Sequence, residues 1–220
     1  MSSPLSPVGQ KDNAFSALRQ FARKRPTLDC CELCSAELCA EHQHLIDQAA
    51  RKIVCACDAC AILFSSQSAT KYKRVPRRIQ FLPQFEITDA QWDSLMVPIE
   101  MAFFFKSGAA GKVSAFYPGP AGATESLLSL ETWEDIERDN PALREIEPEV
   151  EALLVNRVGA ARGVAAQYYI VPIDECYKLV GLMRLRWHGL SGGTEVWREV
   201  TKFFSSLKER ADVVGEEANA

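Results

Sequence analysis

One short stretch constrains this chain more than any other, because the residues from Cys30 to Cys60 include seven of its eight cysteines and two of its three histidines. Within the stretch, two C-x-x-C pairs begin at Cys31 and Cys57. Each pair can chelate a metal ion from one side, and a hairpin between them would bring the four sulfurs together. A module this small has little core, so a bound ion would supply part of its folding free energy. The spacing predicts a metal site with the ligands Cys31, Cys34, Cys57 and Cys60.

The same stretch offers further ligands. The additional candidates are His42, His44 and Cys55, and Cys30 and Cys39 lie in the same window. One ion on four cysteines, one ion with three sulfurs and a histidine, and two neighbouring ions are all compatible with this pattern. His42 and His44 are two positions apart, so in a strand they face the same way and could together hold a metal or a phosphate. The alternative is a pair of half-exposed polar residues on a hairpin.

Ligand chemistry and compartment both favour zinc. Residues 1–20 lack the apolar segment of a signal peptide, and no apolar run is long enough for a membrane helix. We therefore expect a cytoplasmic protein without a membrane partner, in which clustered cysteines suit thiolate ligation better than disulfides. Zn²⁺ is the expected cofactor, and in a closed site it would be structural. Iron in the same tetrahedron, or an iron–sulfur cluster, is the alternative.

Length and composition predict one sizeable core beside a small metal-held module. The chain has 220 residues, of which 47% are hydrophobic, and that is enough for a single globular core. The expected divisions are a flexible basic leader (1–27), a metal-binding module (28–66), a basic linker (67–80), an α+β domain (81–210) and a flexible tail (211–220).

Within residues 81–210, apolar runs bounded by turn residues predict strands and then helices. The candidate strands are 81–87, 101–107, 113–117, 126–130 and 167–173, and 150–155 suits strand or helix. The proline- and glycine-rich residues 117–126 are expected to form a loop. Candidate helix N-caps are Thr88, Asp174 and Thr194, and the last two precede the C-terminal helices. The expected fold is α+β: a zinc-ribbon or treble-clef-like N-terminal module, then a mixed sheet with C-terminal helices on one face.

The charge distribution argues against a general nucleic-acid coat. The formal net charge is -4, whereas phosphate binding depends on many uncompensated cations. One local basic run consists of Lys71, Lys73, Arg74, Arg77 and Arg78. It is read as a solvated linker whose cations could offset nearby thiolates, or as a patch for an anionic partner.

Motifs for catalysis are scarce. The sequence has no phosphate-binding glycine loop, no H-E-x-x-H pair and no G-x-S-x-G elbow, and its only histidine outside the cysteine-rich stretch is His188. Cys176 lies on an apolar helix face without a nearby histidine, which is typical of a packed core thiol. Whether the protein is an enzyme is uncertain, and the sequence favours that it is not.

Several stretches together carry a family resemblance. They are CELC at 31–34, H-x-H-L at 42–45, C-x-C-x-x-C-A-x-L-F at 55–64, AFFF at 102–105, YPGPAGATES at 117–126, VEALLVNR at 150–157, VPIDECYKLVG at 171–181 and W-x-G-L-S-G-G-x-E-V-W at 187–197. The chain resembles, from about Cys31 to Leu207, an uncharacterised bacterial domain family encoded in gene clusters of high-affinity [NiFe] hydrogenases, chiefly in actinobacteria. The residues that match the family's pattern are Cys31, Cys34, His44, Cys57 and Cys60.

The resemblance implies an accessory protein whose partner is a hydrogenase subunit or a maturation factor. We therefore expect a non-enzymatic metal-binding accessory or assembly factor that docks through its cysteine module. One alternative is a small iron-thiolate, rubredoxin-like or iron–sulfur protein that transfers electrons. A second alternative is a zinc-ribbon protein that binds nucleic acid through its knuckles and basic run.

Overall fold

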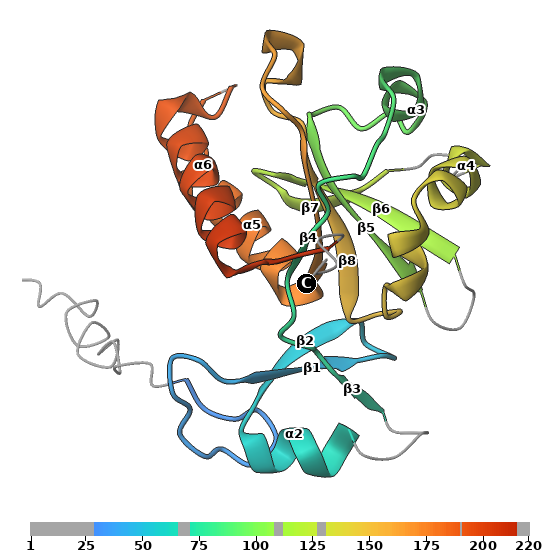
Figure 1. Cartoon of the computed structure of the whole chain (residues 1–220). Coiled ribbons are helices and arrows are strands. Elements are labelled where there is room, and N and C mark those ends of the chain that lie inside the picture. Colours follow the sequence, from blue (N-terminus) through green and yellow to red (C-terminus); the bar gives the residue numbers. More distant parts are fainter. Residues whose placement is uncertain (1–28, 66–70, 108–111, 127–130, 190, 215–220) are drawn as a thin grey trace, which may run out of the picture.

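The protein forms two sheets, a small one near the N-terminus and a large one built from the rest of the chain (Figure 1). The computed structural model describes residues 29–65, 71–107, 112–126, 131–189 and 191–214. The predicted leader (1–27) and the last residues of the predicted tail (215–220) lie outside this range. In the part described, no helix combines the length and apolar character needed to cross a membrane.

The small sheet has the strand order β2-β1-β3 and is entirely antiparallel. Its elements are β1 (Gln43–Asp47), β2 (Lys52–Ala56), the helix α2 (Asp58–Ser65) and β3 (Tyr72–Arg74). The β1–β2 turn is fixed by Asp47, whose Oδ1 accepts the N–H groups of Ala49 and Ala50. Since β3 pairs with β1, the predicted basic linker (67–80) contains a strand of the module.

The large sheet has seven strands in the order β10-β4-β9-β8-β5-β6-β7. They are β4 (Gln80–Phe81), β5 (Met101–Ser107), β6 (Lys112–Gly119), β7 (Gly122–Glu125), β8 (Glu151–Asn156), β9 (Gln167–Pro172) and β10 (Asp212–Val213). All neighbours are antiparallel except β10 and β4, which are parallel. The sheet is therefore mixed, as predicted.

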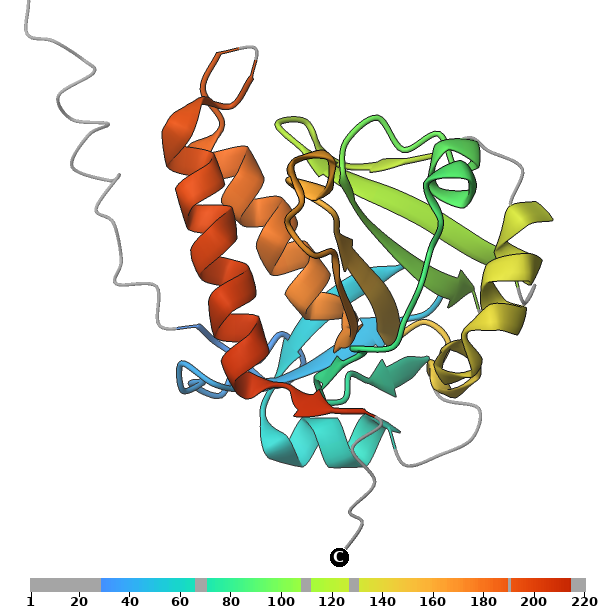
Figure 2. The ribbon, with the colours of Figure 1, turned by 45° about the horizontal axis from the view of Figure 1, so that its top comes forward.

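Both faces of the large sheet are covered, which the phenylalanines of β5 illustrate. Side chains alternate along a strand: Phe103 and Phe105 pack in the core under the C-terminal helices, whereas Phe104 stacks on Trp133 in the opposite core. One face carries α5 (Ile173–Arg186) and α6 (Gly193–Arg210). The other carries α3 (Asp89–Ser94), α4 (Glu131–Asp139) and η1 (Pro141–Glu145) (Figure 2). A short turn, η2 (Ala160–Arg162), connects β8 with β9.

Several predicted elements are confirmed. The expected α+β class, the β5–β6 hairpin and the two C-terminal helices are all present. The side chain of Thr88 accepts the N–H of Gln91 and caps α3 in a capping box. Of residues 150–155, which suited strand or helix, all but the first lie in the central strand β8, which is buried at five of its six positions. The identity of the N-terminal module as a zinc ribbon or treble clef stays a prediction.

Other expectations were wrong in detail. Residues 117–126 form most of a β6–β7 hairpin, because Gly122, at φ 118°, permits a tight reversal. The N-caps of α5 and α6 are Pro172 and Gly192, not Asp174 and Thr194. Of the predicted strand 81–87 only the first residue belongs to a strand, β4, and residues 127–130 of the predicted strand 126–130 lie outside the described residues. The predicted tail (211–220) begins with β10, which hydrogen-bonds to β4.

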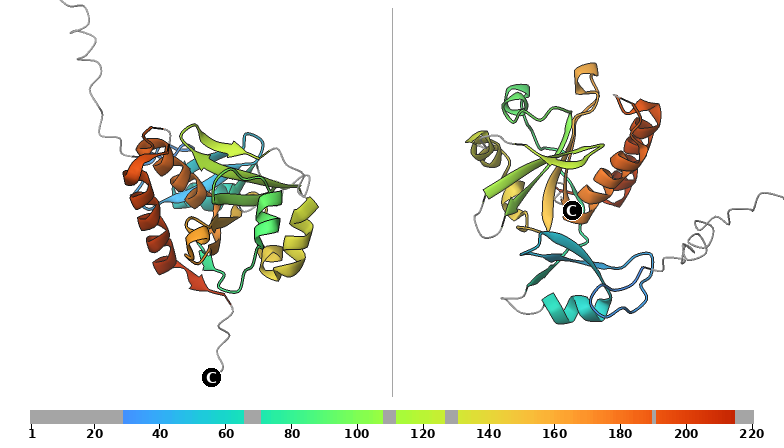
Figure 3. Two further views of the ribbon diagram at one scale, coloured as in Figure 1. Left: turned by 90° about the horizontal axis from the view of Figure 1, so that it is seen from above. Right: turned by 180° about the vertical axis from the view of Figure 1, so that it is seen from behind.

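The small sheet lies against one end of the large one, next to the first turn of α5 (Figure 3). Ile46 of β1 belongs to the core under the C-terminal helices, and Ile53 of β2 packs against it. The module also has its own small core around Leu45 and Val54. The two sheets are thus joined by apolar contacts as well as by the chain.

Candidate metal centre

The first knuckle is a tight turn from Cys31 to Cys34. Ser35 N–H donates to the carbonyl of Cys31 at 2.8 Å, and Ser35 has a left-handed φ of 63°. The neighbouring Glu32 ties this turn to β2, because its backbone N–H donates to Cys55 O and its carboxylate accepts the Cys55 N–H. The turn is therefore held beside the end of β2 by one backbone and one side-chain hydrogen bond.

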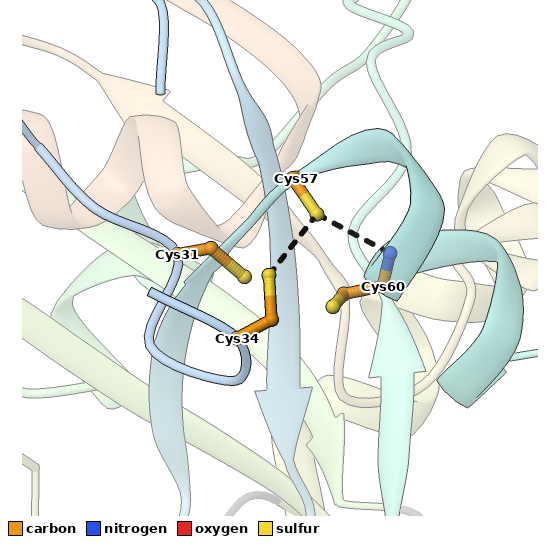
Figure 4. Close-up of side chains that lie close together, drawn as sticks. All are labelled: Cys31, Cys34, Cys57 and Cys60. Carbon is orange, nitrogen blue, oxygen red and sulfur yellow. Dashed lines mark hydrogen bonds between the residues drawn. The ribbon is translucent and has the colours of Figure 1, made fainter. Parts of the chain in front are cut away.

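The second knuckle joins β2 to α2. Cys57 directly precedes the helix and Cys60 lies in its first turn. The backbone N–H of Cys60 donates to Cys57 Sγ at 3.5 Å, and Ala61 N–H donates to the carbonyl of Cys57. Figure 4 shows the four sulfurs pointing toward one point between the two turns.

The geometry of the four sulfurs fits a tetrahedral ion. All four Sγ atoms lie within 4.8 Å of one another, and Cys34 Sγ is 3.7 Å from Cys57 Sγ. A tetrahedron with zinc–sulfur bonds of about 2.3 Å has sulfur–sulfur edges of about 3.8 Å. Cys31 and Cys60 are buried, whereas Cys34 is exposed and Cys57 is half-exposed. The cluster could therefore bind a metal ion at one edge of the module.

The electrostatics of the cluster also suit a cation. Burial alone would raise the pKa of the Cys31 thiol, but backbone N–H groups, first among them that of Cys57, lower it to about 6. Burial and the neighbouring thiols raise the pKa of Cys60 to about 12. Only part of the cluster is then ionised near neutral pH, and an ion must displace the remaining protons to bind four thiolates.

The structure separates the additional candidates from these four cysteines. His42, His44 and Cys55 form a second group, whose ligand atoms also lie within 4.8 Å of one another. Cys39 Sγ contacts the carbonyl of Glu41, and the backbone of Cys30 forms an isolated antiparallel β-bridge with that of Glu37. The four cysteines and the group of His42, His44 and Cys55 are thus two separate sets of candidate ligands. Whether one ion or two bind stays a prediction.

A model of a protein family matches residues 30–211, and so covers both cysteine pairs and nearly all of the large sheet. The chain belongs to the family of unknown function DUF5947. This match confirms the resemblance to an uncharacterised family. The match does not link the chain to a hydrogenase. Searches of curated proteins and of solved structures found no match. For this DUF5947 protein, function must be argued from the site.

Sequence reasoning missed one residue of this DUF5947 protein's site. Asp174, which was expected to cap α5, instead accepts a hydrogen bond from His44 Nδ1, and the two atoms are 2.9 Å apart. The two residues are 130 positions apart, and the sequence contains no pattern that would pair them. The only available signal was a carboxylate at a predicted helix start, for which capping is the ordinary explanation.

Most cations of the basic run are engaged within the chain. The contacts are Lys71 to Asp47 at 2.8 Å, Lys73 to Glu147 at 3.0 Å, Arg74 to the amide oxygen of Gln43 at 3.0 Å, and Arg78 to both oxygens of the fully buried Glu151. An anionic partner stays a prediction, and it would compete with these internal contacts.

Cys176 is fully buried, as expected of a core thiol, and burial raises its pKa well above the ordinary value.

Proposed function

We propose that the protein is a non-enzymatic metal-binding accessory or assembly factor of a [NiFe] hydrogenase that docks through its four-cysteine module. Zinc is the proposed ion, since four thiolates with no open position suit a structural site. The hydrogenase subunit or maturation factor, as partner, comes from the sequence resemblance. The cytoplasm is the proposed location because it keeps such thiols reduced.

The observation that carries the docking proposal is an apolar surface on α2. Ile62, Leu63 and Phe64 follow Cys60 and the buried Ala61 in α2, and their exposed fractions are 63%, 65% and 38%. Contiguous exposed apolar side chains mark interaction sites more often than single ones do. A metal ion bound by Cys57 and Cys60 would fix the first turn of the helix that presents them. The ion then stabilises the position of α2, and α2 provides the contact surface.

Docking can be tested with a charge placed in this surface. Ile62→Asp should reduce co-purification of hydrogenase subunits or maturation factors with the full-length protein, because a carboxylate cannot be desolvated against an apolar partner. Leu185→Asp is the matched control, since Leu185 is 79% exposed on α5 and lies outside the module. Equal recovery of partners with both variants would contradict docking through α2.

The hydrogenase association has its own test. Deletion of the gene should lower hydrogenase activity or leave its subunits incompletely assembled, and the wild-type gene should restore both. The Ile62→Asp gene should restore them less well than the Leu185→Asp gene. If the deletion changes neither activity, assembly nor cluster content, the association is wrong.

Electron transfer is a second candidate, and the exposure of the cluster favours it. Cys34 is exposed and Cys57 half-exposed, so an iron ion at this position would lie close to a docked redox partner. An iron-thiolate centre absorbs visible light, whereas zinc does not. A coloured native protein with stoichiometric iron would therefore favour this function over structural docking.

A further inference from the structure

A second set of metal ligands lies on the small sheet, apart from the four cysteines. His44 of β1 is directly opposite Cys55 of β2 in the antiparallel register. His42 is two positions before His44, and the two imidazole ring centroids are 4.8 Å apart. Side chains two positions apart share one face of an extended chain. One ring nitrogen of each histidine and the Cys55 Sγ atom lie within 4.8 Å of one another.

The hydrogen bond of His42 leaves its second nitrogen available to a ligand. His42 Nδ1 lies 3.0 Å from the carbonyl oxygen of Cys39. A carbonyl only accepts, so Nδ1 carries the proton and Nε2 has the lone pair. Nε2 is buried and has no hydrogen-bond partner among the described residues. A buried, unpartnered acceptor is costly unless something binds it.

The contact of His44 fixes the same tautomer. Its Nδ1 lies 2.9 Å from Asp174 Oδ2, and the side chains are only 18% and 14% exposed. A carboxylate accepts this bond, so Nε2 of His44 also has its lone pair available. Metal-bound histidines almost always donate their other N–H to a carboxylate or a backbone carbonyl. His44 and His42 show one arrangement each.

We propose that His42 Nε2, His44 Nε2 and Cys55 Sγ bind a second transition-metal ion, and that Asp174 orients His44 as a positioning residue. Three protein ligands leave the fourth position of a tetrahedron for an exchangeable ligand. A pocket of about 460 Å³ lies beside these ligands, because His42, His44 and Asp174 line it together with the start of α5, whereas Cys55 lies outside its lining. The second site is open, in contrast to the closed four-cysteine site.

The ligand set restricts the ion. Imidazole and thiolate suit zinc and neighbouring divalent transition metals, whereas magnesium and calcium prefer oxygen. The pocket wall also carries Arg77, Lys178 and Arg210, of which Lys178 and Arg210 pair with Glu175. The same wall carries the carboxylates Glu41, Asp174 and Glu175, which balance these cations. The fourth ligand is therefore a water molecule or a small anion.

Metal counting on the full-length protein tests the second site. After saturation with Zn²⁺ and dialysis against a weak chelator, the wild type should retain two ions per chain. His42→Ala and His44→Ala should each retain one, because the four-cysteine site is untouched. His188→Ala is the control and should retain two, since this exposed histidine lies beyond the end of α5. A single ion in the wild type, or two in His44→Ala, would overturn the proposal.

A positioning role for Asp174 predicts a graded loss. Asp174→Asn should weaken binding of the second ion roughly 10–100-fold while the first ion stays bound. Unchanged affinity for the second ion would show that Asp174 does not orient the ligand.

X-ray absorption of the fully loaded wild type needs no variant and so does not depend on their folding. The proposal predicts imidazole nitrogen in the first coordination shell, whereas a shell of sulfur alone would overturn it. In either case the four-cysteine ion remains, so failure here is distinguishable from failure of the proposed docking function.

Discussion

Gly192 shows how a single residue limits this fold. It is the N-cap of α6 with φ 85°, and a Cβ atom there would lie 2.8 Å from Val196 Cγ1 and 3.2 Å from the Trp187 ring. Neither neighbour is at the free end of a flexible side chain. The turn between α5 and α6 therefore requires glycine for two reasons, its left-handed backbone and the lack of space.

Substitution of Gly192 should reveal both effects. We expect Gly192→Ala to lower the free energy of unfolding by roughly 2–4 kcal/mol, from the left-handed strain and the overpacking together. Gly189→Ala is the control, because Gly189 has φ 65° but no atom within 4 Å of the added methyl group, and it should cost about 1 kcal/mol. Equal losses in urea titrations would contradict the steric argument.

At the scale of elements, Glu175 connects the two C-terminal helices. It lies in the first turn of α5, and Arg210 at the end of α6 donates to both of its carboxylate oxygens at 3.1 Å. Burial alone would raise the pKa of Glu175, but the hydrogen bonds from Arg210 and Lys178 lower it below the ordinary value of 4.5. Ionised Glu175 therefore stabilises the packing of α5 against α6.

This pKa shift predicts a pH-dependent contribution to stability. Because the folded-state pKa is below the unfolded value, the contribution is fully present above pH 4.5 and is lost as the pH falls through the folded pKa. Unfolding titrations should show that Glu175→Gln is less stable than the wild type at neutral pH and that the difference narrows below pH 4.5. A difference that stays constant down to acid pH would contradict this assignment.

The module and the large sheet should respond differently to metal removal. Among the residues that the structure describes, the module's own apolar core contains seven buried residues, and two of them are the proposed ligands Cys31 and Cys60. A strong chelator should therefore abolish hydrogen-exchange protection in α2 and β1–β3, while β5, β8 and β9 remain protected. Zn²⁺ should restore the lost protection. If chelation left α2 protected, the module would not depend on the ion.

At the scale of the whole molecule, the sequence predicts local patterns well and distant contacts poorly. The C-x-x-C spacing, the Thr88 capping box and the β5 phenylalanines are local signals, and the structure agrees with each. The His44–Asp174 contact joins residues that only the packing of the module against α5 brings together. Proline and glycine are rare within strands, so Pro118 and Gly119 predict a loop where the structure has the β6–β7 hairpin.

We propose that the two knuckles bind zinc through their four thiolates. Metal analysis of natively purified, full-length protein, with its visible spectrum, tests this most directly. We predict bound zinc and no visible absorption, with loss of the ion from this site in Cys60→Ser. The ion should remain in Cys39→Ser, since the exposed sulfur of Cys39 donates to the backbone carbonyl of Glu41 and lies outside the four-cysteine cluster. Protein without a transition metal, a coloured iron centre, or an unchanged metal content in Cys60→Ser would contradict the account.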